Sequence, residues 1–236
     1  SPNVVLNTAV AEALAQFYKE LEGTAPEDME TAVHELIKRA IRKHKKVIFN
    51  GNGYTDEWIK EAEERGLYNL VSTPDALPQF IADKNIELFT KEEIYSRYEI
   101  LLENYVKTIN IESKTLQEML TKDFIPAVNG YAAEVAVNAN EKKALIEGLA
   151  TTAEESIVKE LTEASNTLSA KVAELKAVTE KADAAAEEDM QKAAESFHKD
   201  VLTLMDEMKD VANAAEEKIP DEELPYPTYD QMLFYV

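Results

Sequence analysis

A pair of glycines, Gly51 and Gly53, stands where a nucleotide-binding loop could form. It follows the apolar run 47–49 and precedes a helical pattern, as in loops that hold the phosphates of a dinucleotide. Such loops have a third glycine, but Asp56 occupies its place and its carboxylate would oppose a phosphate. No series of βαβ units surrounds the loop either. We therefore interpret the glycines as turn residues in an ordered loop and predict no cofactor-binding residue.

One Glu-x-x-His pattern, Glu195 to His198, has the spacing with which di-iron helical bundles direct two ligands inward. Those sites need two such patterns and two further carboxylates, and the chain has one. Phe197 belongs to a series of apolar residues with heptad spacing, 190–215, that forms one face of a predicted helix. Glu195 and His198 therefore lie at the edge of that face or point to solvent. Glu30 and His34 are likewise interpreted as a surface pair, so we predict no metal ligand.

The inventory for nucleophilic catalysis is three histidines, no cysteine and no Gly-x-Ser-x-Gly turn. Acidic residues are plentiful but are distributed along helix faces, as solvated charge is. We predict no catalytic residue. A basic cluster, residues 38–46, could hold a phosphate. We interpret it instead as cations in the last turns of a helix, where they offset the partial charge of the helix end.

The net charge of −21, from 25 basic and 46 acidic residues, excludes two classes of partner. Such a surface repels phosphate backbones and anionic lipids, so we expect no nucleic-acid and no membrane partner. No apolar run approaches the ~18 to 20 residues of a membrane span, and no signal peptide is visible. The absence of cysteine suits a reducing compartment. We expect a cytoplasmic protein.

The elements that would position these residues are all helices apart from the strand-like run 47–49, so we predict a mostly helical, all-α chain. A first helix, 4–21, repeats Val5, Ala9, Ala13, Phe17 and Leu21 every four residues and ends at Gly23. Capping boxes at Thr24 and Thr90 and a cap at Thr55 begin later helices, and Gly66 ends one. The helix after Thr90 is predicted to end at Pro126, with a domain boundary at 126–130.

Beyond that boundary two apolar series follow heptad spacing. The first is Ile157, Leu161, Ala164, Leu168, Val172 and Leu175, continued by Val178 or Thr179; the second is Met190, Ala194, Phe197, Val201, Leu204, Met208, Val211 and Ala215. Each series alone would expose its seam, which predicts an antiparallel coiled-coil-like hairpin with its turn at 181–189. The turn lacks Gly and Pro, so one continuous helix is the alternative. The resulting division is an N-terminal helix, a helical body, a hairpin and a proline-spaced docking tail, at 1–23, 24–130, 131–219 and 220–236.

The loop between the glycine pair and the next helix is our candidate contact site. Its glycines allow close backbone approach, its asparagines can hydrogen-bond their own turn, and its aromatic side chains offer surface. The alternative is that the loop only packs against its own domain. The candidate residues are Asn50, Gly51, Asn52, Gly53, Tyr54 and Trp58.

Several strings in family order make the chain similar to the C-terminal portion of type III glutamine synthetase. The most specific are Phe-Asn-Gly-Asn-Gly-Tyr at 49–54 and Tyr-x-Lys-Thr-Ile-Asn-Ile-Glu at 105–112. The others lie at 2–12, 47–58, 73–78, 96–112 and 225–229, with Leu233 and Phe234 at the end. The heptad region is similar in composition only.

This resemblance implies a parent enzyme that ligates ammonia to glutamate with ATP and Mg or Mn, in a large homo-oligomer. In that family the metal-binding glutamates and the substrate-binding arginines precede the Asn-x-x-x-Asn-Thr-x-x-Ala-Glu helix, which matches residues 3–12 here. We therefore expect an inactive structural and assembly region whose partner is the upstream catalytic domain. The alternative is a stand-alone acidic coiled-coil interaction module, which has no reason to carry these strings.

Overall fold

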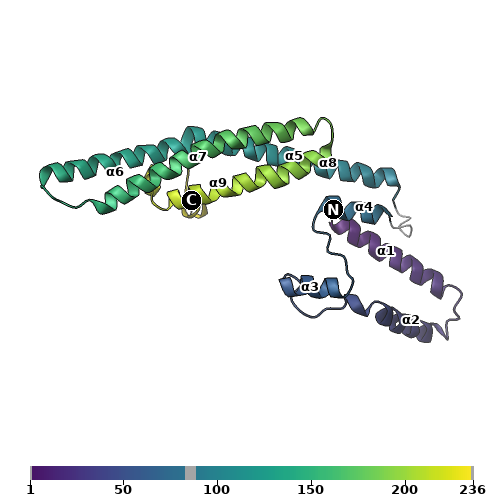
Figure 1. Cartoon of the computed structure of the whole chain (residues 1–236). Helices are drawn as coiled ribbons and strands as arrows, with labels where there is room; N and C mark the ends of the chain where they lie inside the picture. The colour runs from purple at the N-terminus through teal and green to yellow at the C-terminus, as the bar shows by residue number, and fades with distance from the viewer. Residues whose placement is uncertain (1, 83–88, 235–236) are drawn as a thin grey trace. The chain divides into compact units, whose positions relative to one another are not determined.

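The computed structural model describes residues 2–82 and 89–234 and forms two compact units that divide between Tyr98 and Glu99 (Figure 1). Within those ranges every regular element is a helix, which confirms the all-α prediction. None of the helices in the described ranges is long and apolar enough to span a membrane.

The first unit consists of separate helices, and few of its described side chains are buried. Its elements are α1 (Pro2–Leu21), α2 (Met29–Lys43), the 3₁₀ turn η1 (Lys45–Val47), α3 (Asp56–Glu64), α4 (Thr73–Ala82) and the start of α5 (Lys91–Met119). Gly23 and Gly66 end α1 and α3 with φ values of 86° and 66°, as the sequence predicts. The buried side chains described in this unit are Thr8, Leu36, Ala62, Leu77 and Ile94.

Two local predictions for the first unit are wrong. The capping box predicted at Thr24 does not form, because residues 25–28 make a turn in which Asp28 N–H donates to the Ala25 carbonyl, and α2 begins only at Met29. The strand-like run 47–49 forms no strand. Ile48 has an extended backbone, but a side chain, that of Arg65, binds its carbonyl oxygen.

The second unit is a bundle of three long helical rods. The first rod joins α5, the π-helical turn η2 (Leu120–Phe124) and α6 (Ile125–Leu145); the second is α7 (Thr152–Ala185); the third joins α8 (Met190–Ser196), the π-helical turn η3 (Phe197–Leu202) and α9 (Thr203–Glu216). Rod two packs along α6, and rod three runs back along rod two in the opposite direction (Figure 1). The predicted antiparallel hairpin is confirmed, and the alternative of one continuous helix is wrong.

The hairpin turn lies at 186–189, inside the predicted interval. Its second helix begins where Asp189 caps it, because the Asp189 carboxylate accepts the backbone N–H groups of Gln191 and Lys192 at 3.0 and 3.1 Å. Both heptad series supply the core, with these members buried: Leu161, Leu168, Leu175, Ala194, Phe197, Val201, Leu204, Met208 and Ala215.

The predicted helix end at Pro126 is wrong, since the rod runs through it to Leu145. In a regular α-helix the proline ring would meet the carbonyl of Lys122. That carbonyl lies in the wider π turn η2, where Ile125 N–H reaches back to Leu120, so the ring is accommodated. The predicted boundary at 126–130 therefore falls inside a helix.

The tail contains the 3₁₀ turn η4 (Asp221–Glu223) and α10 (Tyr229–Leu233). Tyr226 stacks on Phe124 of the bundle, with ring centroids 6.2 Å apart. Thr228 and Gln231 form a capping box that starts α10. Met232 and Leu233 at the end of α10, and Phe234 after it, are exposed.

Candidate contact site

The predicted contact loop is closed by an aromatic stack with an arginine beside it. The rings of Phe49 and Trp58 lie 4.1 Å apart, nearly parallel, and the guanidinium of Arg65 lies 5.8 and 5.5 Å from their centroids. Arg65 Nη1 also donates to the carbonyl oxygens of Lys46 and Ile48, each at 3.1 Å, and its Nη2 pairs with Glu61. One side chain thus holds the start of the loop against α3.

The interior of the loop is held by its own polar groups. Asn52 Oδ1 accepts the N–H of Tyr54 at 3.0 Å, and Thr55 Oγ1 donates to the Asn52 carbonyl at 3.3 Å. Thr55 also caps α3 by accepting the N–H of Trp58, as predicted. Hydrogen bonds from its own backbone N–H and from Thr55 lower the pKa of the Glu57 carboxyl.

The two glycines differ in what they permit. A Cβ on Gly51 would clash with the far end of the Phe49 ring, so a larger residue at this position would displace the ring. A Cβ on Gly53 would meet only ordinary contact, 3.9 Å from Trp58. Phe49 therefore packs on the backbone of the loop as well as on Trp58.

The structure separates the two aromatic residues that the sequence groups together. Trp58 is half-buried in the stack and belongs to the internal packing of the loop, whereas Tyr54 is 99% exposed. Tyr54 therefore presents its ring to solvent while its backbone N–H is held by Asn52 Oδ1. Sequence reasoning missed Phe49 and Arg65, because Phe49 lies 9 positions before Trp58 and 16 before Arg65, and no local pattern marks these contacts.

A second candidate surface lies on α1. Leu6, Val10 and Leu14 are 63, 57 and 60% exposed and recur every four residues, so they form one stripe along the helix. The predicted face of α1 lies one residue earlier; Ala9 and Phe17 of that face are also exposed, and the Val5 side chain lies outside the described part. Contiguous exposed apolar surface marks a contact site.

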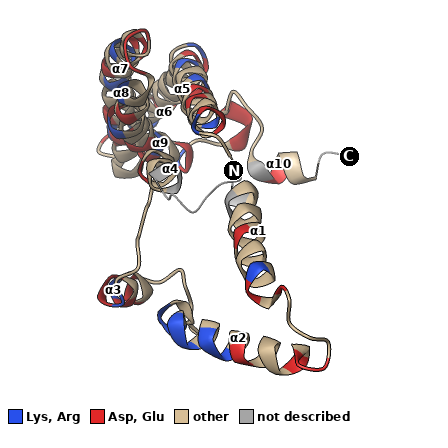
Figure 2. Cartoon of the chain, turned by 90° about the vertical axis from the view of Figure 1, so that its right-hand side faces the viewer, with Lys and Arg blue, Asp and Glu red and all other residues tan. Residues whose placement is uncertain are grey.

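The other predicted patterns are explained by neighbouring side chains. Arg39 pairs with Glu20 and Lys38 with Glu35, and the last turn of α2 carries Arg42 and Lys43 (Figure 2). The remaining lysines of the basic cluster, Lys45 and Lys46, lie in η1. Nδ1 of His198 lies 3.2 Å from the Tyr105 hydroxyl. No group of three metal-ligating side chains lies together in the described ranges, so we assign no ligand for a metal ion.

Comparison with known proteins gives consistent matches. A family model described as the glutamine synthetase C-terminal domain matches residues 32–143, which cover parts of both units. A glutamine synthetase of Butyrivibrio fibrisolvens is 41% identical over 94% of this chain and 32% of its own length. The type-3 glutamine synthetase of Dictyostelium discoideum is 31% identical over 99% of this chain and 33% of its own length.

A glutamine synthetase of Bacteroides fragilis is 26% identical over 98% of the chain, again over 33% of the relative. The chain thus spans about a third of the length of the curated relatives it matches. The chain belongs to the glutamine synthetase family and is a C-terminal portion of the type III form.

Proposed function

We propose that this chain is a structural and assembly region of a glutamine synthetase and carries none of its catalytic residues. The parent reaction is the ATP-dependent ligation of ammonia to glutamate, with Mg or Mn as the metal. The described residues hold no group that fits such a metal, so we derive no step of the reaction through them. Its partners are the upstream catalytic region and further copies of the same protein.

The exposed stripe of α1 carries this proposal. Three large aliphatic side chains on one helix face stay exposed in the part of their unit that the structure describes, and burying each would contribute roughly 1.5–3 kcal/mol. The relatives are about three times as long as this chain. We infer that the upstream region covers the stripe, so α1 forms part of its wall.

The test is a triple substitution in the full-length enzyme, Leu6→Ser, Val10→Ser and Leu14→Ser. We expect loss of glutamine formation and of the native oligomer, measured by product assay and light scattering. The matched control is Ile111→Ser, because Ile111 of α5 is 66% exposed but lies on the bundle. Wild-type activity and assembly in the triple variant would contradict the proposal, as would glutamine formation by the present chain alone.

We also propose the loop at 50–58 as a second contact, with Tyr54 as its anchor. Its partner is the catalytic region or a neighbouring subunit, since the net charge of −21 opposes nucleic acid and anionic lipid. Asp56 and Glu57 beside the anchor likewise disfavour phosphate. The proposal includes a cytoplasmic location, which the absence of cysteine suits.

The two aromatic residues allow a clean experiment on the loop. Tyr54→Ala should leave the melting temperature of the isolated chain unchanged and should weaken assembly or activity of the full-length enzyme. Trp58→Ala, the comparison variant, should lower the melting temperature of the isolated chain because it removes the stack with Phe49. If Tyr54→Ala leaves the full-length enzyme fully assembled and active, the loop packs only within its own unit.

The alternative, a stand-alone acidic interaction module, is less well supported. The family model crosses from the first unit into the bundle, so the bundle alone is not the matched domain.

A further inference from the structure

The second half of α2 combines exposed apolar side chains with positive charge (Figure 2). Ile37 and Ile41, 46 and 53% exposed, lie one turn apart on the same side of the helix. Lys38 and Arg42 each follow one of these isoleucines by one residue, about 100° further round the helix, so a cationic row runs beside the apolar row. Lys45 in η1 continues the positive charge. We call these five residues the α2 surface.

Most of the charge on the α2 surface is left unpaired by the described part of the chain. Lys38 Nζ lies 3.1 Å from Glu35 Oε1, in an exposed pair. Arg42 and Lys45 make no ion pair within the described ranges, and residues 38–46 contain no acidic side chain. Such a patch attracts a negatively charged partner, and the exposed isoleucines require that the partner also carry apolar groups.

The tail carries the complementary pattern. From residue 219 onward it has four acidic side chains and no basic one. All four are exposed: Asp221, Glu222, Glu223 and Asp230. Leu233, 76% exposed, lies three residues after Asp230 and therefore beside it on α10, and Phe234 is 79% exposed. The tail thus presents negative charge together with apolar surface.

The base of the tail is held in place, whereas the described side chains at its end stay exposed. Tyr226 stacks on Phe124 of the bundle. The capping box of Thr228 and Gln231 fixes the start of α10. A segment that is already ordered loses little conformational entropy when a partner covers its apolar side chains. The tail is therefore suited to bind a second surface.

We propose that the tail of one copy docks on the α2 surface of a second copy. The end of α10 covers the two isoleucines, and the tail carboxylates lie beside the three cations. The two surfaces differ, so the contact is head to tail, and its repetition closes a ring or extends a filament. Such a contact rests on the proposed assembly role, since copies of the protein must associate, but it uses neither α1 nor the loop at 50–58.

Other occupants match the α2 surface in one respect only. Nucleic acid and anionic lipid supply negative charge, but the net charge of −21 repels both. A free phosphate would leave the isoleucines uncovered. The tail of a second copy supplies both the negative charge and the apolar side chains.

The test places a photo-cross-linker at the end of the tail in the full-length enzyme. p-Benzoylphenylalanine takes the place of Phe234, and irradiation links it to the protein groups that lie against it. We expect a cross-linked dimer on a denaturing gel, and mass spectrometry of its peptides should place the link within residues 37–45. The matched control carries the same group in place of Ile111, which is 66% exposed on α5 and should give no link to α2.

Charge reversal then tests the pairing of the two surfaces. Lys38→Glu, Arg42→Glu and Lys45→Glu together should lower the yield of the cross-linked dimer about tenfold, because three attractions become repulsions. Adding Asp221→Lys, Glu222→Lys and Asp230→Lys to the same chain should restore most of the yield. All six side chains are exposed, so neither set removes a buried contact, and a rescue of this kind cannot come from misfolding.

A cross-link within one chain, which leaves a monomer on the gel, overturns the proposal. A link to the upstream region, no link at all, or a reversal without rescue overturns it as well. The triple substitution of Leu6, Val10 and Leu14 separates this result from the proposed function. If that variant loses its oligomer and the tail gives no link to α2, the assembly role stands and only the tail contact is wrong.

Discussion

The two units of this chain differ in how many of their apolar side chains are buried. The bundle, residues 99–236, has a core between its three rods, with Leu161, Leu168, Leu175 and Phe197 fully enclosed. The first unit leaves Leu6, Val10 and Leu14 exposed and encloses few side chains. The bundle is organised by its own core, whereas the described part of the first unit has few buried side chains.

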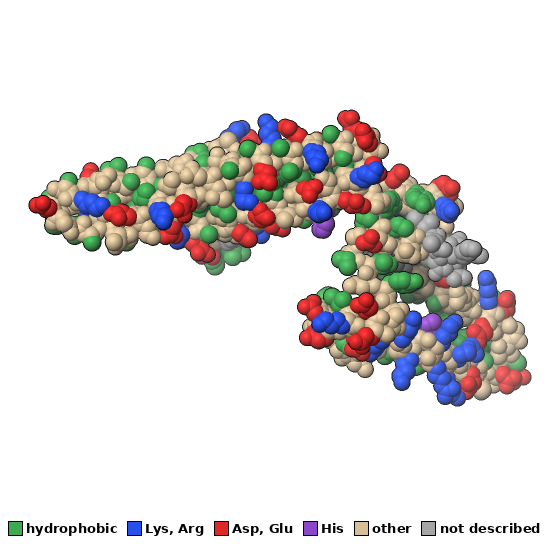
Figure 3. Space-filling model, in the orientation of Figure 1, with side chains coloured by type: hydrophobic (Ala, Val, Ile, Leu, Met, Phe, Trp, Pro, Cys, Tyr) green, Lys and Arg blue, Asp and Glu red, His purple; other side chains and the backbone are tan. Residues whose placement is uncertain are grey.

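The charges of the two units differ in the same sense. The bundle carries 13 basic and 29 acidic residues, net −16, whereas residues 1–98 carry 12 and 17, net −5. The space-filling view shows charged side chains spread along the bundle (Figure 3). High net charge opposes association, so the charge of the first unit opposes contact with an acidic partner less than that of the bundle does.

The largest expected difference between the units is in hydrogen exchange of the isolated chain. Amides of α7 should exchange only by unfolding of the bundle, whereas those of α1 should exchange by local opening. A gap of roughly 4 kcal/mol in opening free energy makes α7 exchange on the order of 10³-fold more slowly. Exchange followed by mass spectrometry measures this ratio, and equal protection of α1 and α7 would contradict the comparison.

Truncation of a core residue should affect the bundle more than the first unit. Phe197→Ala should lower the free energy of unfolding by about 3–5 kcal/mol, because it leaves a cavity in the seam of α7 and η3. Leu36→Ala in α2 should cost about 2 kcal/mol or less, since few buried neighbours surround it. Urea denaturation followed by circular dichroism compares them, and an equal cost would show that the first unit has a comparable core.

The loop at 50–58 gives a smaller and local effect. Gly51→Ala places a methyl group against the Phe49 ring and should cost about 1–3 kcal/mol, displacing the ring from Trp58. The chain has one tryptophan, so its fluorescence reports this stack directly. Gly53→Ala is the matched control and should leave the emission unchanged. Identical spectra for the two variants would mean that Phe49 does not depend on Gly51.

The smallest effect is the pH dependence of tail docking. Burial, helped by the negative charge of Glu216, raises the pKa of Tyr226 to about 12, while an unfolded tyrosine titrates near 10. The neutral phenol is therefore favoured when docked. Its contribution is complete below pH ~10 and is lost as the pH rises through about 12.

Absorbance at alkaline pH should show one phenol that ionises after the others and is absent in Tyr226→Phe. The phenylalanine variant cannot ionise, so its tail should remain docked over that range. Ionisation of every tyrosine near pH 10 in the wild type would rule out this contact in solution.

Local signals in the sequence determined much of the secondary structure. Gly23, Gly66 and Thr55 mark helix ends because a positive φ or a side-chain cap is a property of one or two residues. The capping box of Thr90 and Glu93 forms as predicted, with Glu93 accepting the Thr90 N–H at 2.8 Å. The heptad series determined the hairpin, since a seam on each of two helices can be buried by pairing them.

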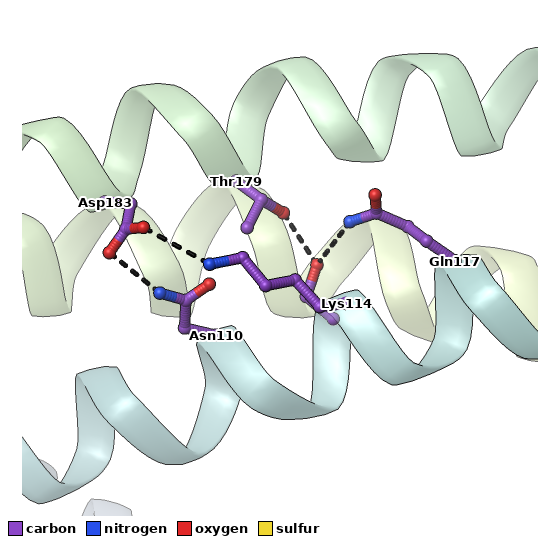
Figure 4. Close-up of polar contacts among 6 residues, drawn as sticks. Asn110, Lys114, Gln117, Thr179 and Asp183 are labelled. Carbon is purple, nitrogen blue, oxygen red and sulfur yellow. Dashed lines mark hydrogen bonds and ion pairs between the residues drawn. The ribbon is translucent and has the colours of Figure 1, made fainter.

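Contacts between distant residues were decided only by the tertiary structure. The stack of Phe49 on Trp58 joins side chains that no local pattern relates. The same holds for the hydrogen bond between the hydroxyl groups of Ser113 in α5 and Thr179 in α7 (Figure 4). The continuation of the helix through Pro126 depends on a π turn, which residue propensities do not predict. The sequence thus determined which residues favour helices and which faces are apolar. Whether an apolar face is covered within its unit depends on the neighbours that folding supplies, and among the described residues Leu6, Val10 and Leu14 of α1 stay exposed.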